Sequence, residues 1–109
     1  MQYPKFLHLV EAVRQLPGTP TLDAQEERLL NNFAVCWYQG QQIKVLEAMH
    51  SQDGLSPSTV HRRIKILRQK GMLELVNDDA DNRIKYIVAT PRCKKYFAGL
   101  ERCLVTATQ

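Results

Sequence analysis

The segment from Ser56 to Gly71 gathers side chains that could hold a polyanion. It contains five cations and no acidic residue, so it carries a formal charge of +5, whereas the whole 109-residue chain carries +4. Positive charge concentrated in one segment is typical of an electrostatic surface for nucleic acid. A solvated basic helix is the alternative that charge alone leaves open. The five cations are Arg62, Arg63, Lys65, Arg68 and Lys70.

The same segment has the start and stop signals of a helix. Ser56 is a residue type that caps a helix N-terminus, and Pro57 suits the first helical position because an N–H there would have no helical partner. Gly71 suits the left-handed residue just after a helix end. Apolar side chains at i, i+4 and i+7 predict one face that docks on a core and leave the opposite face basic. These apolar residues are Val60, Ile64 and Leu67.

After Gly71 the pattern changes from helix to strand. Residues 72–76 and 83–89 are apolar or rich in β-branched and aromatic types and predict two strands, and the Asn- and Asp-rich residues 77–82 predict a turn between them. The resulting hairpin has Arg83 and Lys85 near its tip. A basic helix followed by such a hairpin predicts a winged helix-turn-helix, which is a mainly α fold with a small β-hairpin wing (α+β).

A helix of this kind can enter the DNA major groove, with its first turns at the base edges and its cations at phosphates. Arg62 is the best candidate for a bidentate contact to guanine, because its planar fork matches the O6 and N7 acceptors. The remaining cations of the helix, Arg63, Lys65 and Arg68, are expected at phosphates. On the wing we expect Arg83, together with Lys85, at the minor groove or the backbone. The groove-facing candidates are Pro57, Ser58, Thr59, His61 and Arg62.

These residues resemble the DNA-binding domain of the MarR (multiple antibiotic resistance regulator) transcription factors over roughly residues 22–92. Four motifs carry the resemblance: residues 55–62 opening the basic helix, Gly71-Met72-Leu73 closing it, Asp81-Asn82-Arg83 in the wing, and Ala89-Thr90-Pro91 after it. The resemblance implies a repressor-type regulator that binds double-stranded DNA, with Asp81 bracing Arg83. Two positions depart from the family pattern: Asn82 replaces an arginine, and Arg63 replaces an apolar residue.

The rest of the chain predicts a helical scaffold. Asp23 is a candidate cap for a helix that extends to Trp37, and Glu26 three residues later completes a capping-box pattern. We expect one domain over residues 1–109, divided into an N-terminal helix and linker (1–21), the winged core (22–90) and a C-terminal helix (91–109). The smaller expected features are a helix over residues 4–16, a break at 17–20, a helix over 43–50 and a turn at 51–54.

The two flanking helices each carry an apolar stripe that the winged core does not need for its own closure. The stripes could pack on each other within one chain, or they could form a two-fold homodimer. We expect the dimer, because two-fold dimers are the commonest assembly and match palindromic DNA sites. The expected interface residues are Phe6, Val10, Val13, Tyr96, Phe97, Leu100 and Leu104.

Signals of other functions are weak. The three cysteines, Cys36, Cys93 and Cys103, form no CxxC pair, which predicts reduced thiols. The histidines fall on three different predicted helices, and no HExxH, GxSxG or phosphate-binding glycine loop is present. We therefore expect no enzyme activity, no cofactor and no metal site, and the sequence assigns no small-molecule effector. No apolar run approaches the length of a membrane span and no signal-peptide pattern is present, so we expect a cytoplasmic protein without membrane contact.

Two other functions fit the same residues. A winged helix can serve as a protein-interaction module, and a replication or partition accessory protein can bind DNA without regulating a promoter. The first alternative predicts that Arg62 is dispensable, whereas the second shares the DNA-binding surface.

Overall fold

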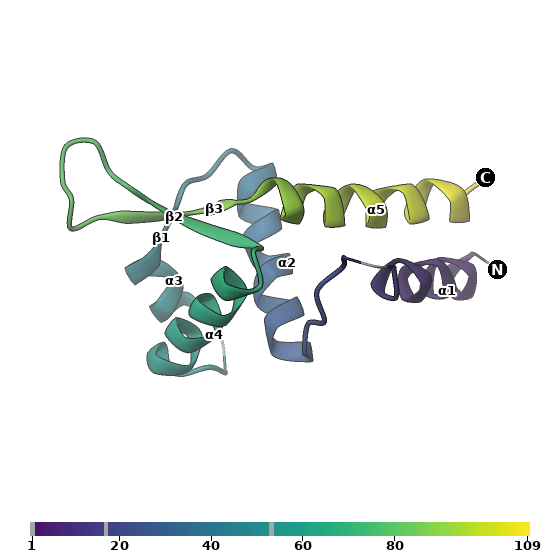
Figure 1. Cartoon of the computed structure of the whole chain (residues 1–109), viewed down its shortest axis with the longest axis horizontal. Helices are drawn as coiled ribbons and strands as arrows, with labels where there is room; N and C mark the ends of the chain where they lie inside the picture. The colour runs from purple at the N-terminus through teal and green to yellow at the C-terminus, as the bar shows by residue number, and fades with distance from the viewer. Residues whose placement is uncertain (1, 17, 53) are drawn as a thin grey trace. The chain divides into compact units, whose positions relative to one another are not determined.

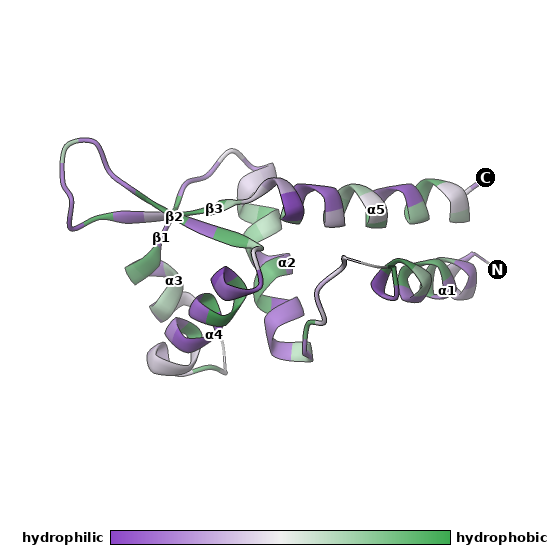
Figure 2. Ribbon diagram, in the orientation of Figure 1, coloured by the Kyte–Doolittle hydropathy of each residue, from purple (hydrophilic) through white to green (hydrophobic). Residues whose placement is uncertain are grey.

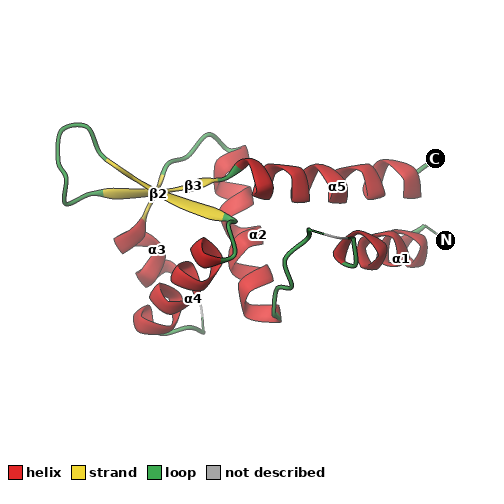
Figure 3. Cartoon of the chain, in the orientation of Figure 1, coloured by secondary structure: helices red, strands yellow, loops and turns green. Residues whose placement is uncertain are grey.

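The computed structural model describes residues 2–16, 18–52 and 54–109, and these form five helices and a three-stranded antiparallel sheet (Figure 3). The α+β class predicted from the sequence is confirmed. The predicted chain break at Pro17 and the turn at Asp53 lie outside the described residues. By their internal contacts the residues group into two compact units, one of residues 22–90 and one of residues 1–21 with 91–109. The organisation as a single domain remains a prediction.

The unit of residues 22–90 begins with helix α2 (Ala24–Tyr38). Asp23 is its N-cap and accepts a hydrogen bond from the backbone N–H of Glu26 at 2.8 Å, as the sequence predicts. At the other end of the helix, Trp37 donates its indole N–H to the carbonyl of Ile87 at 3.1 Å and so ties α2 to the sheet. The apolar face of α2 is fully buried at Leu29, Leu30 and Phe33.

Residues 43–50 correct one prediction. Instead of one helix they form a short strand, β1 (Ile43–Lys44), followed by helix α3 (Val45–Ser51). Ile43 pairs with Ile87, so the hairpin has a third strand on its open edge. A two-residue strand shows no periodicity of its own, and its pairing partner is more than 40 residues away in the sequence.

Helix α4 (Pro57–Gln69) has the predicted signals at both ends. The Ser56 hydroxyl accepts a hydrogen bond from the backbone N–H of Thr59 at 3.2 Å, and Gly71 has a φ of +78°, the left-handed conformation that suits glycine after a helix. Its apolar stripe is buried as predicted, with Val60 and Leu67 fully inaccessible and Ile64 nearly so. The opposite face is therefore the one that meets solvent.

The hairpin consists of β2 (Leu73–Asn77) and β3 (Lys85–Ala89), which pair in antiparallel register, and the sheet order is β1-β3-β2. Strand β2 lies one residue further along the chain than predicted, whereas β3 starts two residues later than predicted, so Arg83 lies in the connecting loop rather than in a strand. Figure 2 shows this loop mostly in the hydrophilic colours. Ile87 on the central strand is 1% exposed, which anchors the hairpin to the core.

The second unit contains helices α1 (Tyr3–Arg14) and α5 (Pro91–Ala107), which pack side by side (Figure 1). Gly99 permits the close approach, since a Cβ there would lie 3.3 Å from Cγ1 of Val13. Val10 and Tyr96 of the predicted dimer stripes are thereby buried within one chain, whereas Leu104 remains 52% exposed. None of the helices in the described residues has the length and hydropathy needed to cross a membrane.

Candidate nucleic-acid interface

The basic face of α4 is built by the helix period itself. With Val60, Ile64 and Leu67 committed to the core, the side chains of Arg62, Lys65 and Arg68 are left exposed. Pro57, Ser58 and His61 are also exposed on the first turns, and Thr59 is half-buried. The hydroxyls of Ser58 and Thr59 lie 3.2 Å and 2.8 Å from the Ser56 hydroxyl, so part of their bonding capacity serves the helix cap.

A hollow of about 380 Å³ lies between α3, the first turns of α4 and the wing. Its basic lining residues come from three different elements: Lys44 from β1, His61 from α4, and Arg83 and Lys85 from the wing. The fold therefore brings one predicted helix candidate, His61, together with both wing candidates on one concave surface, whereas Lys65 and Arg68 line a separate hollow beside β2. Lys44 was not among the predicted DNA-binding residues. The sequence predicts a helix over residues 43–50, whereas the structure places Lys44 in strand β1.

Arg83 is 91% exposed at the side chain and is held by Asp81. Its Nε and Nη2 donate to the two oxygens of the Asp81 carboxylate at 3.0 Å each, and its backbone N–H donates to Oδ1 at 3.0 Å. These hydrogen bonds lower the pKa of Asp81 and raise that of Arg83. This arrangement orders the guanidinium at the wing tip, in the geometry that the resemblance implied.

A second carboxylate organises the base of the wing. Asp78 accepts a hydrogen bond from the Tyr86 hydroxyl at 2.8 Å and from the backbone N–H groups of Ala80 and Asp81 at 2.9 Å and 3.0 Å. The hydrogen bond from Tyr86 is the largest cause of the lowered pKa of Asp78, and the same bond raises the pKa of Tyr86. No sequence pattern indicated this Asp78–Tyr86 pair, since the two residues are eight positions apart across a turn.

We predict that the wing turn loses order in acid before the core does. A carboxylate whose folded pKa is depressed stabilises the structure above the ordinary aspartate pKa of about 3.9, and that contribution disappears as the pH falls through the lower folded value. NMR chemical shifts of the Ala80 and Asp81 amides, followed from neutral pH to about 2, should change before those of α2. In Asp78→Asn, the Ala80 and Asp81 amides should have at neutral pH the chemical shifts that the unaltered protein shows only in acid. Asp79→Asn, which changes the exposed neighbouring residue, should not alter these chemical shifts at neutral pH. Wing and core amides that change together in all three proteins would contradict this prediction.

Arg63 does not lie with the other candidate DNA-binding residues. Its guanidinium bonds residues of α2: Nη1 lies 2.6 Å from Asp23 Oδ2, and Nε lies 3.0 Å from Gln25 Oε1. Lys70 also turns to α2, with Nζ 2.5 Å from Glu26 Oε2. The backbone N–H of Glu26 is the largest cause of the lowered pKa of Asp23, and the charge of Arg63 adds to it. The expectation that Arg63 binds phosphate therefore conflicts with its intramolecular contacts.

The cysteines and histidines do not form another site. None of Cys36, Cys93 and Cys103 forms a disulfide, and burial raises the pKa of Cys93 to about 11, which disfavours the reactive thiolate. The histidines lie on α1, α3 and α4. Among the described residues, no group of three or more His, Cys, Asp or Glu side chains is arranged to hold a metal ion.

Solved structures share this architecture. The chain superposes on YusO from Bacillus subtilis with a TM-score of 0.56 at 20% identity, covering 94% of this chain and 64% of that one. The superposition on the transcriptional regulator Tm0710 from Thermotoga maritima has a TM-score of 0.61 at 18% sequence identity and covers 94% of this chain and 63% of that one. The superposition on the heme sensor protein PefR, solved with heme and carbon monoxide, has a TM-score of 0.61 at 16% identity and covers 92% of this chain and 66% of that one. This chain has the winged helix-turn-helix fold. The resemblance to MarR regulators is confirmed at the level of the fold.

The sequence comparisons add no further relatives. No protein-family model matches this chain. No curated protein matches it either. The chain spans slightly less than two thirds of the length of each of the three solved structures.

Proposed function

We propose that this chain binds double-stranded DNA in a sequence-specific manner and acts as a repressor-type transcriptional regulator. The observation that carries the proposal is the concave surface on which His61 of α4 meets Lys44, Arg83 and Lys85. Helix α4 would enter the major groove, and the wing would contact the adjacent backbone or minor groove. Similarity in fold to the transcriptional regulator Tm0710 supports the same proposal.

Each basic residue has a distinct role in this proposal. Arg62 reads a base edge, and Lys65 and Arg68 bind phosphates. Arg83 and Lys85 hold the wing against the duplex, and Lys44 joins them at the floor of the hollow. Arg63 leaves the set of DNA contacts because its guanidinium is engaged by Asp23 and Gln25. The protein performs no catalysis in this role and needs no cofactor.

We predict that binding falls steeply with salt concentration, because cations that neutralise phosphates release condensed counterions. Fluorescence anisotropy on a labelled duplex between low and moderate salt measures the slope of log affinity against log salt. Lys65→Ala should weaken all duplexes about equally and flatten this slope by about one unit. The exposed Lys5 on α1 provides a matched control, and Lys5→Ala should leave the slope unchanged. A slope near zero for the unaltered protein would reject DNA binding and favour a protein-interaction module.

We also propose that the protein acts as a two-fold homodimer assembled through the unit of α1 and α5. Packing of these helices on each other accounts for the burial of Val10 and Tyr96 but leaves Leu7, Leu104 and Val105 about half exposed. Half-buried apolar residues of the same two helices are Phe6, Val13, Phe97 and Leu100. A two-fold dimer would place two recognition helices about one DNA turn apart, on the order of 34 Å, and favour an inverted repeat.

We predict that Leu104→Asp converts the dimer into monomers, because a charge buried in an apolar interface without a partner is costly. Leu104 is exposed within one chain, so the fold should survive, and circular dichroism can verify that. Sedimentation at tens of micromolar distinguishes the two states, and Thr106→Asp on the same helix serves as the charge control. An unaltered protein that sediments as a monomer would reject the dimer, and α1 and α5 would then only cover each other.

A further inference from the structure

The five cations of the basic segment divide into two groups that point in different directions. Arg62, Lys65 and Arg68 are exposed, whereas the side chains of Arg63 and Lys70 are only 21% and 29% exposed. Arg63 and Lys70 are seven positions apart, which is about two helical turns, so both lie on the same side of α4 and its C-cap. That side faces the start of α2.

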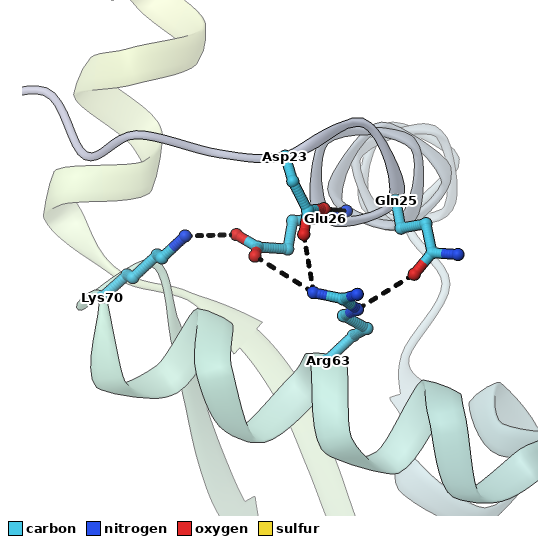
Figure 4. Close-up of polar contacts among 5 residues, drawn as sticks. All are labelled: Asp23, Gln25, Glu26, Arg63 and Lys70. Atoms are coloured by element: carbon cyan, nitrogen blue, oxygen red, sulfur yellow. Dashed lines mark hydrogen bonds and ion pairs between the residues drawn. The ribbon is translucent and has the colours of Figure 1, made fainter.

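Glu26 lies between these two cations, as Figure 4 shows. Its carboxylate is 4% exposed; Oε1 lies 3.5 Å from Nη1 of Arg63, and Oε2 lies 2.5 Å from Nζ of Lys70. The same Nη1 of Arg63 also donates to Asp23 Oδ2 at 2.6 Å, and Nε of Arg63 donates to Gln25 Oε1 at 3.0 Å. One buried carboxylate of α2 therefore bridges two positions on the recognition helix that are two turns apart.

The remaining contacts between α4 and the rest of the unit are of a different kind. The apolar stripe of Val60, Ile64 and Leu67 is buried, but hydrophobic burial is non-directional and tolerates small rotations of a helix. Charged hydrogen bonds are short and directional, and a buried carboxylate without its partners is costly. Glu26 makes one such short bond, to Lys70, and its longer 3.5 Å contact with Arg63 adds to the 2.6 Å bond from Arg63 to Asp23. Charged contacts at two separate turns oppose both the rotation and the sliding of the helix. Reading base edges needs that precision, since binding geometries must be held to within about 0.5 Å.

We propose that Glu26 is a positioning residue that sets the sequence specificity of DNA binding by fixing the rotation of α4 against α2 through Arg63 and Lys70. This inference rests on the proposed DNA-binding function. It also assigns these two cations of the basic helix to the protein interior rather than to the DNA. Loss of the Glu26 charge removes the bond that holds Lys70 and leaves Arg63 held by Asp23 and Gln25 alone. The helix is then less firmly fixed and Lys70 can turn toward solvent, so specific and non-specific binding respond in opposite directions.

The test compares affinities for two duplexes: the sequence enriched from a random pool by the unaltered protein, and a scrambled version of it. Glu26→Gln should reduce the ratio of the two affinities about tenfold, which is comparable to one mismatched base pair. Binding to the scrambled duplex should be unchanged or tighter, with a steeper salt dependence. Glu101→Gln, an exposed position on α5 with the same change of charge, should leave the ratio as it is.

The double variant Glu26→Gln/Lys70→Met separates positioning from net charge. This double variant has the formal charge of the unaltered protein but lacks the Glu26–Lys70 bond. Its salt dependence should therefore match that of the unaltered protein, while the ratio of its affinities for the two duplexes should stay as low as in Glu26→Gln. If Glu26→Gln does not fold, Lys70→Met alone should still lower the ratio, since it removes one of the two attachment points. A Glu26→Gln protein that folds and keeps the ratio, or one that loses affinity for both duplexes equally, would overturn the positioning role. An unaltered protein that enriches no sequence would instead overturn the proposed function.

Discussion

Replacing Arg62 with alanine is expected to weaken binding to the preferred duplex by about 1–3 kcal/mol, with a much smaller loss on random DNA. Arg62 is exposed on α4, six residues after the Ser56 cap, and it is not part of the Glu26 network. A bidentate contact to guanine uses the planar fork of the guanidinium, so Arg62→Lys should restore only part of the affinity. Competition binding with both duplexes at one fixed salt concentration measures the two losses.

Arg68→Ala is the matched control for Arg62→Ala, because it removes the same group from an exposed position two turns further along the helix. It should weaken both duplexes to a similar degree, as expected for a phosphate contact. Equal losses on both duplexes for Arg62→Ala as well would assign Arg62 to the DNA backbone. A winged helix that binds only proteins predicts no loss from either change.

Replacing Leu67 with alanine is expected to destabilise the fold by about 2–5 kcal/mol. Leu67 is fully buried on the apolar stripe of α4, so the smaller side chain leaves a cavity between α4 and the core. The loss is a large fraction of the roughly 5–15 kcal/mol that stabilise a typical small protein. Urea unfolding followed by Trp37 fluorescence and circular dichroism gives the free energy of unfolding.

Val35→Ala is the control for Leu67→Ala, since Val35 is 57% exposed on α2 and its truncation should change stability by less than about 0.5 kcal/mol. A loss below about 1 kcal/mol for Leu67→Ala would mean that α4 is not anchored through this stripe. Specificity would then depend on the polar bridge at Glu26 to a greater degree.

Helix α4 was predictable because its signals are local. The Ser56 cap, Pro57 and Gly71 define its ends, and the spacing of its apolar residues defines its buried face. Each of these features needs only neighbouring residues to be interpreted. The wing was predictable for the same reason, although its second strand starts two residues later than predicted.

The features that sequence analysis missed depend on contacts between distant residues. Strand β1 exists because Ile43 pairs with Ile87, and two residues show no period of their own. Arg63 stands where the family pattern has an apolar residue, but the carboxylate that holds it inward lies 40 residues earlier in the sequence. Glu26 fitted a capping-box pattern, but its carboxylate also bridges to Lys70, 44 residues later. Nothing in the local pattern of charges distinguishes a cation that binds DNA from one that binds another helix.

Enrichment of a random pool of duplexes by the unaltered protein is the most direct test of sequence-specific DNA binding. The exposed face of α4 and the ordered Arg83 predict that the bound pool converges on a shared motif, with two inverted half-sites about 10 base pairs apart if the dimer forms. A bound pool whose sequences stay as random as the starting pool, at salt concentrations that permit binding, would contradict the central claim.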